Sequence, residues 1–111
     1  MSRRDGGAMI LTLSGEFDLD TVAPVAAAFE RASTEPGLVV VDLAGVSFAD
    51  STMVNLLIRA HRELGARFHL AAPSPSLRRL MDLLGLDCVL HLHDSVDEAL
   101  AAGPAAAPDG G

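Results

Sequence analysis

The chain has 111 residues, half of them apolar, and its fifteen acidic residues outnumber its eight arginines, which gives a formal charge of −7. A chain of this size folds as one domain with its own core, and its acidic surface repels nucleic-acid phosphates and anionic lipid. No apolar run reaches the ~18 residues of a membrane span, no signal-like segment opens the chain, and the single cysteine excludes an internal disulfide. We therefore expect a soluble cytoplasmic domain whose partner is a protein.

The first third of the chain predicts a strand and a helix that follow a flexible end. Residues 1–7 are mostly polar and contain glycine, so we expect them to be mobile. Residues 8–13 alternate with the period of two that is typical of a strand, and residues 14–18 are expected to break that strand. A helix should follow, with Asp20 or Thr21 as its N-terminal cap.

The middle of the chain predicts a strand, a helix and a second strand. Residues 38–43 are almost entirely apolar, which is typical of a central strand covered on both faces. Residues 44–50 should form a loop that leads into a helix over residues 52–64, and the next strand is expected over residues 66–71. The apolar stripe of the helix contains Met53, Leu57, Ala60 and Leu64.

Two more helices and a short strand are predicted in the last third. Ser74 and Pro75 have the chemistry of a helix start, and Gly85 should end that helix. A strand is expected over residues 88–92, before a closing helix.

The closing helix is predicted from the spacing of Ser95 and Glu98, which is that of a capping box, and it should continue to about residue 102. Residues 103–111 have the composition of a flexible tail. Parallel strands need crossover connections, and the helices predicted between these strands can supply them. The pattern therefore predicts one α/β domain over residues 8–102 with largely parallel strands.

Three segments, in their order and spacing, resemble the STAS domain, the fold of bacterial anti-sigma factor antagonists. Residues 14–18, SGEFD, resemble the early GELD signature of that family. Residues 41–52, VDLAGVSFADST, resemble its segment hDLSGVxFhDSS, in which h is apolar. Residues 77–100 are similar to its C-terminal pattern of a leucine-rich helix, Gly-Leu, a strand and a short acidic helix. The resemblance covers about residues 9 to 102.

The resemblance implies a small, mixed and mostly parallel sheet of four to five strands, flanked by about four helices. It also implies a phosphorylation switch, in which a kinase that doubles as the anti-sigma factor modifies the first serine after the aspartate. That serine is Ser51 here, with Thr52 as a second candidate. The unphosphorylated protein would bind the kinase and free the sigma factor, and a phosphatase would restore this form. The protein itself would be no enzyme and would bind no cofactor.

The residues around Ser51 support two interpretations by their own chemistry. An exposed hydroxyl at a helix N-terminus could carry a phosphoryl group, because unpaired N–H groups and the helix dipole favour an anion there. The same hydroxyl could instead only cap the helix. Asp50 could hold the loop or assist the kinase. Asp18, in an acidic cluster with Glu16 and Asp20, could contact the partner or belong to a solvated loop.

Met53 and Asn55 stand where the family commonly has glycines, and their added bulk predicts an altered partner interface. Met53 also falls on the apolar stripe of its helix, where a core position is the simpler interpretation. The partner surface expected from the resemblance comprises Asp18, Asp50, Ser51, Thr52, Met53 and Asn55.

For the remaining candidate residues we expect ordinary structural roles. His91 and His93 alternate along a strand without a clear third ligand, so we expect no metal site. Asp42 should bond to local backbone. No glycine-rich phosphate loop, nucleophile elbow or Cys–His pair is present, which argues against an enzyme. The alternative function is a STAS module that serves as an unphosphorylated interaction subunit of a signalling assembly or a lipid-transport complex, with Ser51 structural.

Overall fold

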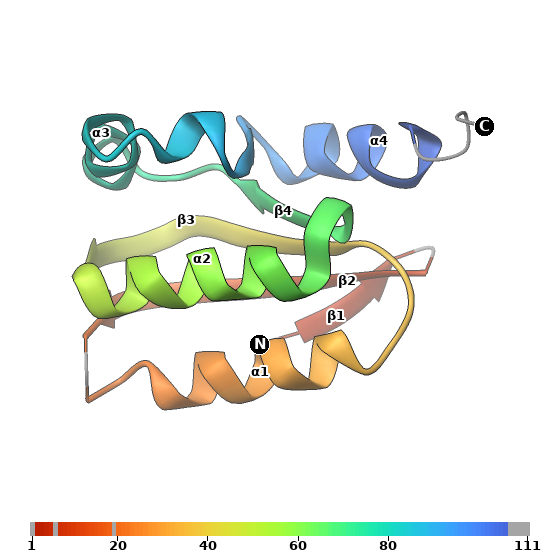
Figure 1. Cartoon of the computed structure of the whole chain (residues 1–111), viewed down its shortest axis with the longest axis horizontal. Helices are drawn as coiled ribbons and strands as arrows, with labels where there is room; N and C mark the ends of the chain where they lie inside the picture. Colours follow the sequence, from red (N-terminus) through yellow and green to blue (C-terminus); the bar gives the residue numbers. More distant parts are fainter. Residues whose placement is uncertain (1, 6, 19, 107–111) are drawn as a thin grey trace.

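The computed structural model describes residues 2–5, 7–18 and 20–106. Among these residues, none of the helices combines the length and hydropathy that a membrane span requires. The helices and strands, labelled in Figure 1, are β1 Ser2–Asp5, β2 Ala8–Phe17, α1 Ala23–Ser33, β3 Val39–Ala49, α2 Ser51–Leu64, β4 Phe68–Ala71, α3 Pro75–Leu83, β5 His91–His93 and α4 Val96–Ala106.

The strands form one sheet in the order β1-β2-β3-β4-β5, with β3 at its centre. The β1 strand pairs with β2 in antiparallel orientation, and each later neighbouring pair is parallel. The predicted α/β class is therefore confirmed, as a mixed and mostly parallel sheet of five strands with four helices.

Helices cover both faces of this sheet, which explains the continuous apolar run of β3. Val39, Val41 and Leu43 face the larger core, to which α1, α2 and α3 contribute. Leu38 and Val40 face a smaller core, which α4 covers. In Figure 1, α4 lies above the strands and α1 lies below them. Since successive side chains of a strand point to opposite faces, β3 has to be apolar at nearly every position.

The N-terminal end differs from the prediction. Residues 1–7 were expected to be mobile, but Ser2–Asp5 form β1, which pairs with β2 from Ser2 opposite Leu11 to Asp5 opposite Ala8. This polar segment shows no apolar alternation, so its strand depends on backbone hydrogen bonds to β2.

Two strands also extend beyond their predicted ends, and this extension builds the candidate site. Residues 14–18 and 44–50 were expected to lie outside strands, but β2 continues to Phe17 and β3 to Ala49. Register shifts between Thr12 and Ser14 and between Gly15 and Glu16 keep the two strands paired. Such irregularities accommodate glycine and serine, which a regular strand disfavours.

The C-terminal half has the predicted elements with shifted bounds. The Ser74 hydroxyl caps α3 by accepting from the Leu77 N–H at 3.3 Å, and Gly85 adopts φ +72° where the helix ends, as predicted. The last strand is His91–His93 instead of 88–92, because a 3₁₀ turn over Leu86–Cys88 precedes it and buries Leu86.

Further shifts occur at β4 and α4. The β4 strand begins at Phe68 after a 3₁₀ turn over Gly65–Arg67, and α4 continues to Ala106 instead of ending near residue 102. Glycine and proline, which occupy positions 103 and 104, have the lowest helix propensities, so the sequence pattern indicated an earlier end. The part of the predicted tail at residues 107–111 lies outside the described residues.

Candidate functional site

The candidate site is the junction at which β3 passes into α2. Asp50 is the N-cap of α2, in extended conformation, and its Oδ1 accepts hydrogen bonds from the N–H groups of Thr52 at 2.9 Å and Met53 at 3.3 Å. The interpretation of Ser51 as the cap is therefore wrong. Of the two roles weighed for Asp50, the geometry matches that of holding the junction.

Ser51 is the first residue of α2, and its side chain is exposed. Its hydroxyl forms no hydrogen bond with any of the residues that the structure describes. Because Asp50 already satisfies two of the N–H groups at the helix end, the Ser51 hydroxyl has no structural duty and faces solvent. Thr52, the second acceptor candidate, is half-buried.

The remaining residues of α2 named as partner contacts divide into one surface residue and one core residue. Asn55 is exposed one turn after Ser51, so the two side chains share a face of α2. Met53 is only 1% exposed and packs in the larger core, as does Leu57 one turn further on. Its prediction as a partner contact is wrong, because position 53 faces the sheet, as its place on the apolar stripe indicated.

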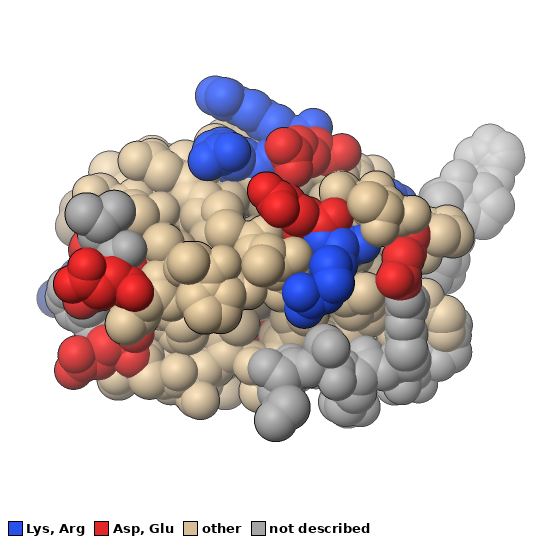
Figure 2. All heavy atoms as spheres, turned by 90° about the horizontal axis from the view of Figure 1, so that it is seen from below, with Lys and Arg blue, Asp and Glu red and all other residues tan. Residues whose placement is uncertain are grey.

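The loop between β2 and α1 lies beside this junction. The backbone N–H of Asp50 donates to the Phe17 carbonyl oxygen at 3.2 Å, which ties the ends of β3 and β2 together. The half-buried carboxylate of Asp18 accepts from the N–H groups of Asp20 at 3.0 Å and Thr21 at 3.2 Å. Figure 2 shows acidic side chains gathered at the end of the molecule where β2 leads into α1.

This bonding corrects one prediction about α1. Asp20 or Thr21 was expected to cap the helix, but Val22 occupies the N-cap position and makes no side-chain cap bond. Thr21 and Asp18 instead bond within the loop, and the Thr21 hydroxyl also lies 3.1 Å from the Glu16 carbonyl oxygen. The loop is therefore held in shape by its own side chains, which keeps Asp18 next to the end of β2.

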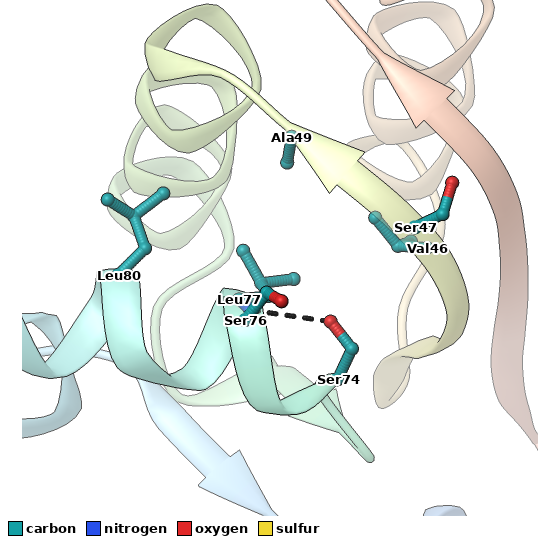
Figure 3. A pocket seen from close by; sticks show the side chains of 7 residues that line it. All are labelled: Val46, Ser47, Ala49, Ser74, Ser76, Leu77 and Leu80. Carbon is teal, nitrogen blue, oxygen red and sulfur yellow. Dashed lines mark hydrogen bonds between the residues drawn. The ribbon is translucent and has the colours of Figure 1, made fainter.

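A groove of about 250 Å³ lies between the end of β3 and α3. Figure 3 shows its lining, which is made of apolar and hydroxyl side chains: Val46, Ser47, Ala49, Ser74, Ser76, Leu77 and Leu80. It reaches Ala49, two residues before Ser51. Sequence reasoning missed it, because β3 was expected to end at residue 43 and nothing in the pattern placed α3 beside its extension. No side chain in this lining carries a charge, so it suits an apolar side chain of a partner.

The two residues discussed as remote metal candidates lie elsewhere. His91 and His93 belong to β5, and the His93 Nε2 lies 2.9 Å from the Nδ1 of His69 on β4. In the part of the chain that the structure describes, no three His, Cys, Asp or Glu side chains are arranged to hold a metal ion. Asp42 accepts from the Ala44 N–H at 3.0 Å, which confirms its local backbone role.

The sheet order and the helices on both faces of the sheet define a small mixed α/β domain, in which an aspartate-capped helix presents an exposed serine. Residues 1–99 match the model of the STAS domain, and the chain belongs to this family.

Solved structures agree with this assignment. An anti-sigma factor antagonist from Mycobacterium paratuberculosis is 30% identical, with a TM-score of 0.84 over 93% of this chain and 91% of that one. The anti-sigma factor antagonist SpoIIAA in its unphosphorylated form is 25% identical, with a TM-score of 0.75 over 90% of this chain and 91% of that one. A structure of the phosphorylated form of SpoIIAA from Bacillus matches with a TM-score of 0.70 over 91% of this chain and 96% of that one.

The same fold occurs in a domain of a membrane transporter. The STAS domain of a SulP transporter from Vibrio cholerae is 17% identical, with a TM-score of 0.69 over 90% of this chain and 83% of that one. At this identity the likeness concerns the fold alone.

Proposed function

We propose that this chain is an anti-sigma factor antagonist that binds a kinase-type anti-sigma factor and is switched off by phosphorylation at Ser51. The observation that carries the proposal is the exposed Ser51 hydroxyl, which is free of hydrogen bonds to described residues while Asp50 caps the helix. Family membership and the likeness to SpoIIAA, a relative with structures of both the unphosphorylated and the phosphorylated form, support the same role.

The electrostatics of the junction explain how such a switch would act. A phosphoryl group adds about −1.5 to −2 charges and three acceptor oxygens. On the first residue of α2 it is tolerated by the helix dipole, so the domain stays folded. Its charge would fall on a surface that already carries Asp50 and Asp18, and a partner shaped for a neutral hydroxyl would be repelled. A loss of about 1–3 kcal/mol weakens binding roughly five- to 150-fold.

The proposed partner surface joins the junction to its surroundings. It contains Asp18, Asp50, Ser51, Thr52 and Asn55, together with the groove between β3 and α3. The acidic loop is complementary in charge to a basic patch on the partner, and the groove is complementary to an apolar side chain. In this role the chain is the substrate and ligand of an ATP-using cytoplasmic partner instead of an enzyme, and a phosphatase restores its active form.

The alternative is a constitutive interaction subunit, in a signalling assembly or a lipid-transport complex, in which Ser51 is never modified. The occurrence of this fold in a SulP transporter supports it. The bulk of Asn55 on the exposed face, where the related motif has glycine, also favours an interface of a different shape.

Phosphorylation and binding tests separate the two functions. After incubation with ATP and a kinase-type anti-sigma factor from the same organism, mass spectrometry should place phosphate on Ser51. Ser51→Ala should abolish labelling, whereas Ser33→Ala, a control at an exposed serine of α1, should not. Ser51→Asp should weaken binding to the partner relative to Ser51→Ala. Phosphate only on other residues, or equal binding of the two variants, would contradict the switch.

A further inference from the structure

All four histidines of the sequence gather at the β4–β5 side of the sheet, although they come from three elements. The His69 ring on β4 stacks on that of His91 with 4.9 Å between centroids, and it lies 5.0 Å from that of His93. His61, near the C-terminal end of α2, contacts the edge of His91 at 5.6 Å. We call these four residues the histidine cluster.

The hydrogen bonds of His69 and His93 show which of their ring nitrogens carry hydrogens. The His69 Nε2 lies 2.9 Å from the Ala66 carbonyl oxygen, which can only accept, so this nitrogen carries the hydrogen. In neutral His69 the Nδ1 is then an acceptor, and His93 Nε2, at 2.9 Å, must donate to it. When both rings are neutral, only one placement of the hydrogens on their nitrogens is therefore compatible with these bonds. A proton added to His93 would go to its Nδ1 and leave the bond intact, whereas a proton on the Nδ1 of His69 would set two N–H groups against each other.

The surroundings disfavour positive charge at His69. It is 6% exposed, and among the described residues it is the one polar or charged residue that is buried. Burial lowers the pKa of His69, and the neighbouring His91 and His93 lower it further, against the opposing effect of the hydrogen bond to the Ala66 carbonyl oxygen. Burial also lowers the pKa of His93 and His91 adds to this, against the opposing effect of Glu98 on α4 and Asp94.

Other charged and polar groups complete the environment. Asp94, between β5 and α4, is paired with Arg78 of α3 at 2.9 Å, so its charge is partly compensated. The Nδ1 of His61 is buried and has no hydrogen-bond partner among the described residues. The carboxylates near the cluster therefore lie at the His93 end, and the His69 end faces carbonyl and imidazole groups.

Apart from the His69–His93 hydrogen bond, β5 is held by backbone pairing with β4 and by the Ala72 N–H, which donates to the His93 carbonyl oxygen at 2.9 Å. The β5 strand has three residues and lies at the edge of the sheet, where it pairs with β4 alone. The α4 helix packs on the smaller core through Ala99, which is fully buried, and through the partly buried Val96 and Leu100. Segments with few buried apolar contacts open at a lower free-energy cost than the rest of a domain.

We propose that the histidine cluster is a pH-sensitive contact, in which proton uptake from solvent at mildly acidic pH breaks the His69–His93 hydrogen bond and releases β5 and α4 from β4. The first proton enters at His93 Nδ1, and the second, at His69 Nδ1, breaks the bond because two cationic rings then face each other. Strands β2 and β3 and the Ser51 end of α2, roughly 15 Å from His61 at 1.5 Å per residue, keep their structure. This inference is independent of the function proposed for Ser51.

Amide hydrogen exchange on the full chain tests the proposal. Between about pH 7.5 and about pH 5.5, on either side of the ordinary histidine pKa, protection corrected for intrinsic rates should fall by about tenfold in β5 and α4 relative to β3. The double variant His69→Gln/His93→Gln should remove this pH dependence. His61→Gln is the matched control, because it changes a ring of the cluster outside the hydrogen-bonded pair, and it should retain the dependence.

A second measurement on the unaltered chain keeps the proposal testable if the double variant does not fold. Long-range nitrogen–proton NMR spectra should show the Nε2–H tautomer of His69 at the higher pH, and the signals of both rings should change in the same pH range as the exchange of β5 and α4. A uniform loss of protection in all strands, or opening at a pH where neither ring titrates, would overturn the proposal.

Discussion

At the scale of single residues, one residue caps α2 and another presents the exposed hydroxyl, although a single serine could have done both. Asp50 caps α2 through the N–H groups of Thr52 and Met53, and Ser51 leaves its own hydroxyl exposed. Modification of Ser51 therefore leaves the two cap hydrogen bonds of Asp50 in place. Because the cap and the proposed acceptor are different residues, modification of Ser51 can change the surface without unfolding α2.

This separation predicts effects of different size on stability for two neighbouring substitutions. Asp50→Ala removes the cap and should lower the free energy of unfolding by about 1 kcal/mol, within the range of roughly 0.5–2 kcal/mol for lost caps. Ser51→Ala should change it by less than about 0.5 kcal/mol, as is usual for surface sites. Urea unfolding monitored by circular dichroism measures both. Asp50→Asn is the control and should recover most of the loss, whereas equal effects at positions 50 and 51 would contradict the assignment of the cap.

At the scale of elements, the extension of β2 and β3 beyond their predicted ends positions the site. The extended strands bring Phe17 and Ala49 side by side and allow the Asp50 N–H to bond the Phe17 carbonyl. The close approach of the strands requires glycine at one point, since a Cβ at Gly45 would lie 2.8 Å from the Ser14 Cβ and 3.1 Å from the Leu13 carbonyl oxygen. The junction is therefore a product of strand pairing as well as of α2.

Gly45→Ala should force β2 and β3 apart and destabilise the domain by about 1–3 kcal/mol, the usual cost of overpacking. Ser47→Ala, at an exposed position of the same strand, is the control and should be nearly neutral. Thermal unfolding of both variants checks this expectation. If Gly45→Ala unfolded at the same temperature as the unaltered chain, the close contact with Ser14 would be relaxed at little cost, and the argument from strand pairing would fail.

At the scale of the whole molecule, the two faces of the sheet are unequally covered. Helices α1, α2 and α3 contribute to the larger core, and α4 alone covers the smaller one. Helix α2 carries the proposed signalling residue at one end and a member of the histidine cluster near the other. The molecule thus combines a well-packed side with a side that depends in part on the His69–His93 hydrogen bond.

The lowered pKa of both histidines predicts how global stability depends on pH. Unfolded histidines titrate near about 6.5, so just below this pH the unfolded chain binds more protons than the folded chain, and stability must rise with pH. The urea midpoint should therefore be highest above about pH 6.5, fall as the pH is lowered through 6.5, and level off below the folded pKa values. A midpoint that increased on acidification over this range would contradict the direction of both shifts.

Local patterns in the sequence determined what each element buries and where several elements end. The stripe of Met53, Leu57, Ala60 and Leu64 identified the buried face of α2, and Ser74 and Gly85 marked the ends of α3, because periodicity and capping are properties of neighbouring residues. Tertiary structure decided the rest. Asp50 and Ser51 can both cap a helix, and the pairing of β3 with β2 placed Asp50 there. The groove beside Ala49 and the histidine cluster join residues from different elements, and their contacts depend on strand register and helix placement, which local chemistry does not specify.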